Sequence, residues 1–139
     1  MRIILDTNII VSGLMSEHGA PAQLLNAWTD KVFVLVTSTM QIAEIASVTH
    51  RPVSRPLITP AHAGRFINDL HRFGTVLDRL PTVDRSRDPN DNFLLAMAEA
   101  GAAEYLVSGD KRGVLALKRH GPTKIVMAKA MLKILGLGE

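Results

Sequence analysis

Four carboxylates stand at positions in the sequence from which they could do chemistry together. Asp6 and Asp110 each follow a short apolar run with the character of a buried strand. Glu44 lies one to two turns into a helical stretch, and Asp91 lies in the first turn of another. Four close carboxylates cannot all stay ionised at low dielectric unless a cation joins them. The oxygen ligands favour Mg²⁺ or Mn²⁺, and such a site can polarise a phosphodiester and activate a water.

Each of these acids also has a purely structural interpretation. Asp6 is suited to cap the turn after its strand, and Asp110 is suited to a turn or to the N-cap of the next helix. Asp88 is in the N-cap position of the helix whose first turn includes Asp91, where an acid favours the helix dipole. Glu44 has the ordinary alternative of a solvated helix position. The four acids carry more weight as an ordered set than any one of them does alone.

The elements that must position these acids alternate between strand and helix. Strands are predicted at about 2–6, 32–36, 75–77, 105–107 and 124–126, and helices at about 21–28, 38–48, 60–73, 91–100, 113–120 and 128–135. The strands are apolar without strict alternation, which is typical of a parallel sheet covered on both faces. The predicted fold class is therefore α/β, a three-layer α/β/α sandwich with a mostly parallel central sheet. In such folds ligands bind at the carboxyl ends of the strands, where Asp6 and Asp110 lie.

Local signals mark several of these boundaries. Ser38 followed by Gln41 has the spacing of a capping box, and Thr59 precedes a proline in the first turn of the next helix. Loops are expected over 50–60 and 78–90, which are rich in proline or polar residues. The apolar stripe of the helix at 60–73 is interpreted as core, with a partner groove as the alternative. The apolar segment at 128–137 could pack on the sheet or on a second copy of the chain.

Composition excludes several classes of protein. The chain has 139 residues, 47% hydrophobic and 21% charged, which is typical of one globular domain and predicts a single domain over 1–139. It has no cysteine, so disulfide frameworks, thiolate zinc sites and cysteine nucleophiles are excluded. The five histidines lack the spacing of a zinc-binding helix. No apolar run reaches the roughly 18 residues of a membrane span, and Asp6 interrupts the apolar start, so we expect neither a signal peptide nor membrane association, and a cytoplasmic location.

The net charge of +3 is distributed in blocks. Residues 88–110 contain five acids and no Lys or Arg, whereas 50–87 contain seven basic residues and three acids, and 111–139 contain seven basic residues and one acid. Basic blocks on both sides of an acidic one favour a surface that attracts polyanions beside a site that needs a cation. The alternative is that the basic residues only solvate helix faces.

At these residues the chain resembles the PIN domain, the nuclease fold of many toxins of type II toxin–antitoxin systems. Asp6-Thr7-Asn8 after the first strand resembles the first acidic motif of that family, and Glu44 falls where the family has its second acid. The third and fourth motifs are similar to residues 87–92, followed by an alanine-rich helix, and to residues 105–110. The resemblance runs over about 2–117 and is nearest to the bacterial toxin branch of the family rather than to the virulence-associated protein C toxins.

The resemblance implies a metal-dependent ribonuclease specific for single-stranded RNA. It implies that the metal ligands and catalytic residues are Asp6, Glu44, Asp91 and Asp110, and that Thr7, Asn8 and Ser108 give polar support. It also implies an antitoxin partner and, by analogy, a homodimer. Four basic residues adjoin the acids in sequence and are candidates to contact the RNA backbone: Arg85, Arg87, Lys111 and Arg112. The family often has a further acid where Lys111-Arg112-Gly113 stands, which leaves open whether one metal ion or two act.

Three other interpretations compete with this one. Phosphatases that form an aspartyl phosphate also have an Asp after the first strand, but they need a second Asp two residues later, where this chain has Asn8. A PIN-like module that binds RNA or a protein without cutting is the main alternative, and metal binding without cleavage would identify it. A structural module in which the acids are only caps predicts no metal affinity.

Overall fold

The computed structural model describes residues 1–51 and 57–138 and is built on a six-stranded sheet. The strands are β1 (Arg2–Leu5), β2 (Val34–Ser38), β3 (Thr75–Leu77), β4 (Tyr105–Val107), β5 (Arg119–His120) and β6 (Thr123–Val126). Their order across the sheet is β3-β2-β1-β4-β6-β5, and every pair is parallel except β5 with β6. The mostly parallel sheet is as predicted, and residues 52–56 of the expected loop lie outside the described residues.

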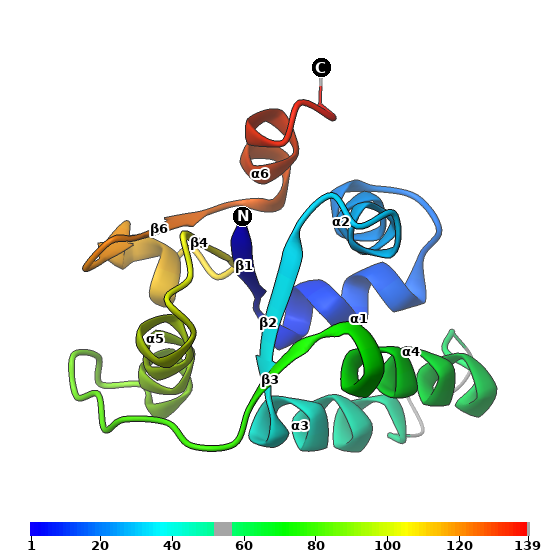
Figure 1. Cartoon of the computed structure of the whole chain (residues 1–139), viewed down its shortest axis with the longest axis horizontal. Coiled ribbons are helices and arrows are strands. Elements are labelled where there is room, and N and C mark those ends of the chain that lie inside the picture. Colours follow the sequence, from blue (N-terminus) through cyan, green and yellow to red (C-terminus); the bar gives the residue numbers. More distant parts are fainter. Residues whose placement is uncertain (52–56, 139) are drawn as a thin grey trace.

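Helices cover both faces of this sheet. They are α1 (Thr7–Met15), α2 (Ala20–Thr29), α3 (Thr39–Thr49), α4 (Pro60–Phe73), α5 (Pro89–Gly101) and α6 (Ala128–Ile134), with a 3₁₀ helix, η1, at Val114–Leu117. Figure 1 shows α5 on one side of the sheet, and α1, α2 and α4 on the other. The predicted three-layer α/β/α sandwich is therefore confirmed.

The strands are apolar on both sides because each side packs against helices. In β1, Ile3 and Leu5 belong to the core shared with α1, α2, α3, α4 and α6, whereas Ile4 belongs to the core shared with α5 and η1. Leu35 and Val36 of β2 divide between the two cores in the same way. Alternate residues of a strand point to opposite faces, so a strand buried on both faces has no polar side.

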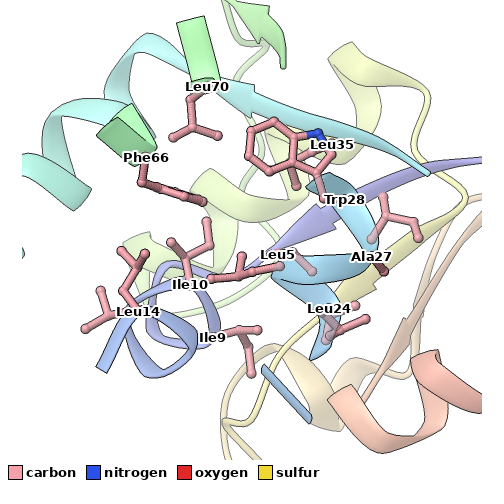
Figure 2. Close-up of a cluster of buried hydrophobic side chains, with 14 of the residues drawn as sticks. Leu5, Ile9, Ile10, Leu14, Leu24, Ala27, Trp28, Leu35, Phe66 and Leu70 are labelled. Atoms are coloured by element: carbon pink, nitrogen blue, oxygen red, sulfur yellow. The ribbon is translucent and has the colours of Figure 1, made fainter. Parts of the chain in front are cut away.

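The larger core is centred on two aromatic rings. Trp28 of α2 and Phe66 of α4 pack edge to face, with ring centroids 5.7 Å apart. Figure 2 shows both rings among aliphatic side chains of β1, β2, α1 and α2. Ala63, Phe66 and Leu70 bury most of the predicted apolar stripe of α4 in this core, as expected. Phe73, the last residue of that stripe, is instead 61% exposed at the end of the helix. Met131 and Leu132 of α6 pack in the same cluster.

The local signals for helix starts hold in the structure. The hydroxyl of Ser38 accepts a hydrogen bond from the backbone N–H of Gln41 at 3.0 Å. The Thr59 hydroxyl caps α4 through the backbone N–H of His62, and the Asp88 carboxylate caps α5 through Asn90 at 2.9 Å. Asp88 therefore has the capping role predicted for it.

Two predictions of secondary structure were wrong. The expected helix over 113–120 is only a short 3₁₀ helix followed by β5, because Lys118 takes a left-handed backbone conformation (φ 62°) and the chain turns back into β6 at Gly121 (φ 56°). α1 at Thr7–Met15 was not predicted. Its first half is rich in β-branched residues, which weakens the helical signal in the sequence.

In the part of the chain that the structure describes, no helix combines the length and the apolarity that crossing a bilayer requires.

Candidate active site

Asp6 lies at the carboxyl end of β1, where α1 begins. Its backbone N–H donates to the carbonyl of Val107 at 2.8 Å, which extends the pairing of β1 with β4 to this residue. The side chain is 5% exposed, and its Oδ2 accepts a hydrogen bond from the hydroxyl of Ser108 at 2.9 Å. Burial raises the pKa of the Asp6 carboxyl above its ordinary value of 3.8. The Ser108 hydroxyl and the Asn8 backbone N–H lower the pKa again, and the charges of Glu44 and Asp110 raise it.

Glu44 reaches this edge on α3, whose first turn is fixed by Gln41. The side-chain amide of Gln41 donates to the carbonyl of Leu5 at 2.8 Å, and its oxygen accepts from the hydroxyl of Thr37 at 2.7 Å. One buried glutamine thus joins α3 to the ends of β1 and β2. Glu44 is half-buried, and its charge acts on Asp6, so the two carboxylates lie near one another.

Asp91 comes from the first turn of α5 and is 4% exposed. The hydroxyl of Ser86 donates to its Oδ2 at 2.9 Å. The preceding loop is held in turn by Asn92, whose side-chain oxygen accepts from the backbone N–H groups of Arg85 and Ser86 at 3.0 and 2.8 Å. The Asp91 carboxylate is therefore oriented by the loop before its own helix.

Asp110 lies two residues beyond Ser108, in the turn that follows β4, and it is exposed. Its Oδ1 accepts hydrogen bonds from the backbone N–H groups of Arg112 and Gly113 at 3.2 and 3.0 Å. Its own backbone N–H donates to the Ser108 hydroxyl at 3.2 Å, and that hydroxyl donates to Asp6. Of the two structural interpretations of Asp110, the turn is the one that the structure bears out, since Asp110 is not the N-cap of η1. Ser108 links the two acids directly.

Gly113 separates Asp110 from Asp91. A Cβ at position 113 would overlap the Asp110 carboxylate and lie 3.1 Å from Oδ1 of Asp91. The Asp91 and Asp110 carboxylates therefore both lie against the Gly113 backbone, where a side chain would collide with them. Glycine at this position lets the two acids approach each other across the backbone.

The four predicted acids thus lie at one edge of the sheet, on four different elements or turns. As they stand, no three His, Cys, Asp or Glu side chains within 1–51 and 57–138 are close enough together to form a metal-binding group. Asp91 and Asp110 are turned toward their own hydrogen-bond donors, and like charges favour separation. The donor set still fits a hard divalent cation, because it consists of carboxylate oxygens and includes the buried Asp6, whose pKa is raised by its burial.

The predicted supporting residues differ in their placement. Thr7 is buried at 3% exposure, and its hydroxyl lies 3.4 Å from the donating amide of Gln41. Ser108 is fully buried, whereas the side chain of Asn8 is exposed. Asn8 contributes to the site through its backbone N–H, which lowers the pKa of Asp6.

The four predicted RNA-contacting residues also fall into two groups. Arg85 donates from its guanidinium to the carbonyl of Arg119 at 2.6 Å and lies 3.0 Å from Nδ1 of His120, so it ties the loop before α5 to β5. The other three have exposed side chains around the acidic edge: Arg87, Lys111 and Arg112.

Sequence reasoning missed three residues that shape the site: Gln41, Ser86 and Gly113. Gln41 was interpreted only as part of a capping box, although its side chain bonds to β1 and β2 instead of to Ser38. Ser86 has a local signature in the sequence. A serine hydroxyl commonly accepts a hydrogen bond from the backbone N–H two residues later, and Ser86 accepts one here from Asp88. Gly113 could be recognised only from the structure.

The comparison with protein families agrees with this geometry. The model of the PIN domain family matches residues 2–112, and the chain belongs to that family. A search among curated proteins found no match to the sequence. PIN domains are generally nucleases and commonly use divalent metal ions. The match covers all four acids and ends just before Gly113.

Proposed function

We propose that this chain is an endoribonuclease that depends on Mg²⁺ or Mn²⁺ and hydrolyses phosphodiester bonds of single-stranded RNA. The observation that carries the proposal is that acids from four separate parts of the chain reach one edge of the sheet, where two of them are oriented by serine hydroxyls. A purely structural role as helix caps would not require the four acids to lie at the same edge of the sheet. Asp6, although it stands at the N-cap of α1, makes no side-chain capping bond there.

The residues that would hold the metal ion are Asp6, Glu44, Asp91 and Asp110. A bound Mg²⁺ or Mn²⁺ supplies charge that polarises the phosphodiester and lowers the pKa of the attacking water. The chain supplies orientation: Ser108 holds Asp6, and Ser86 holds Asp91. Hydrogen-bond partners of this kind orient metal-ligating carboxylates, and the four side chains then have to draw together around the ion.

The proposal gives the basic residues the task of drawing RNA to this edge. Arg87, Lys111 and Arg112 are exposed beside it, and their attraction for a phosphate backbone does not depend on base sequence. Arg85 is engaged with β5, so its part in RNA binding is to position the loop before α5. Cleavage should therefore weaken steeply as salt is raised.

The proposed cellular role is that of a toxin acting on cytoplasmic RNA and held in check by a cognate antitoxin protein. A homodimer of this 139-residue domain is part of the same proposal. These assignments rest on the membership of the PIN family together with the toxin-like motifs at Asp6-Thr7-Asn8 and 105–110. Co-purification of the chain with a partner that suppresses its cleavage would test the role.

The direct test is cleavage of several single-stranded RNAs by the purified protein with Mn²⁺ or Mg²⁺. We expect cleavage that is abolished by EDTA and by Asp6→Asn, and kept by Asp30→Asn, a matched control because Asp30 is exposed at the far end of α2. Metal binding without cleavage of any RNA would instead identify a binding module. Absence of both would refute the carboxylate site.

A further inference from the structure

A groove of about 530 Å³ lies beside the acidic edge, between the start of α3, the loop before α5, and α5 itself. Its apolar wall is formed chiefly by Met40, Leu80 and Phe93, and its charged lining residues are Arg87 and Asp84, both exposed. Met40 is 53% exposed, although a methionine side chain gains by being covered. The groove thus offers an apolar surface bordered by one cationic and one anionic side chain.

Two residues connect this groove to the candidate metal ligands. Ser86 lines the groove and donates its hydroxyl to Asp91. Met40 precedes Glu44 by four residues on α3, so the two side chains lie on the same face of that helix. The groove therefore opens next to two of the four acids, one on each of its flanking helices.

The chemistry of the groove fits part of a nucleotide better than a peptide or a lipid. A nucleobase is flat and largely apolar on its faces, and it packs well against polarisable sulfur and aromatic carbon. Its phosphate carries the negative charge that Arg87 would attract. An RNA strand at the acidic edge would pass beside this groove, because Ser86 lines the groove and bonds to Asp91.

We propose that this groove binds one nucleobase of the RNA substrate, next to the phosphodiester that is cut. The inference rests on the proposed ribonuclease function and adds the element that positions the strand. Met40 forms the exposed wall against which the base packs, and Phe93 forms the floor. The nucleotide in the groove then fixes which phosphodiester lies at Asp6, Glu44, Asp91 and Asp110.

The test measures binding separately from cleavage. Fluorescence anisotropy is measured with Asp6→Asn protein and a labelled single-stranded RNA, and with an abasic ribose-phosphate strand of equal length. We expect the RNA to bind roughly 5- to 100-fold more tightly than the abasic strand. Met40→Ala in the same background should remove most of that difference, and Met40→Leu should restore it. Ile134→Ala is the matched control, since Ile134 is 42% exposed on α6, away from the groove.

Equal affinity for the two strands would overturn the proposal, and so would a difference that Met40→Ala leaves unchanged, because the bases would then be bound elsewhere. Cleavage of RNA by the unsubstituted protein is measured in parallel. Cleavage without base discrimination overturns the groove assignment and leaves the nuclease intact. Loss of cleavage and RNA binding together overturns both.

Discussion

The two ends of the sheet differ in what they bury. At the carboxyl ends of β1, β2 and β4 the buried side chains are polar: Asp6, Thr7, Thr37, Ser38, Gln41, Asp91 and Ser108 are all 5% exposed or less. At the amino ends of β1 and β2 a pocket of about 490 Å³ is lined mostly by apolar side chains, of which Trp28 and Phe33 are buried and Phe73 is exposed. Its polar members are Thr29, Lys31 and Asp69. The carboxyl end thus buries hydrogen-bonded polar groups, whereas the amino end buries aromatic rings beside a mostly apolar pocket.

The difference indicates that the two ends have different tasks. Burying a polar group costs desolvation free energy, and its hydrogen bonds do little more than offset that cost. Within the described residues, no buried side-chain nitrogen or oxygen lacks a hydrogen-bond partner. Burying hydrocarbon stabilises the fold directly. The amino end should therefore control stability, and the carboxyl end should control activity at some expense of stability.

The largest effect is expected at the apolar end. Trp28→Ala removes a ring that is 8% exposed and packs edge to face on Phe66. It should lower the free energy of unfolding by roughly 3–5 kcal/mol, measured by urea denaturation. Phe73→Ala is the control: its ring is 61% exposed, so the change should stay within about 0.5 kcal/mol. Equal losses from the two substitutions would contradict the assignment of stability to the buried cluster.

The next largest effect is expected at the polar end, and it is an effect on rate. Glu44→Gln keeps the shape of the side chain and removes one proposed ligand, so cleavage should fall by roughly 100-fold or more. The melting temperature should stay constant or rise, because Glu44 adds negative charge beside the buried Asp6. Glu17→Gln, at an exposed position, should change neither value. Full cleavage by Glu44→Gln would remove this acid from the site.

A smaller effect is expected from the serine between two acids. Ser108→Ala removes the hydroxyl that donates to Asp6 and accepts from the Asp110 backbone. Affinity for Mn²⁺, measured by calorimetry, should fall roughly 10- to 100-fold, as is usual when the partner of a ligand is lost. Ser47→Ala, on the exposed face of α3, should leave the affinity unchanged. An unchanged affinity in Ser108→Ala would mean that Asp6 needs no orienting donor.

The two ends also differ in how much the sequence reveals. The apolar runs predicted the parallel sheet, and the spacing of Ala63, Phe66 and Leu70 predicted the buried face of α4. The carboxyl ends of two strands predicted where Asp6 and Asp110 would lie. These features follow from periodicity and chain direction, which are local properties.

The details of the polar end could not be derived in the same way. Gln41 bonds to Leu5 across 36 residues, and Ser108 bonds to Asp6 across 102 residues, so neither contact has a local signature. The need for glycine at position 113 arises only because Asp91 and Asp110 approach it from different parts of the chain. The helix expected over 113–120 failed for a related reason, since pairing of β5 with β6 outweighs the local helical pattern.

The smallest effect is expected from the protonation of Asp6, measured without metal. Burial raises the pKa of this carboxyl, so the folded protein holds the proton more tightly than the unfolded chain does. Stability from this group is therefore fully present below the unfolded value, near 3.8, and is lost as pH rises through the interval up to the folded pKa. Asp6→Asn cannot ionise and avoids that loss.

The melting temperature of Asp6→Asn should accordingly exceed that of the unsubstituted protein by a few degrees at neutral pH. The excess should shrink as pH falls and vanish below about 3.8, because both proteins then carry a neutral group at position 6. The other carboxyls titrate in both proteins and cancel in the difference. A constant difference across the whole range would show that the amide acts by its hydrogen bond with Ser108. Ionisation of the buried Asp6 would then not lower the stability of the protein.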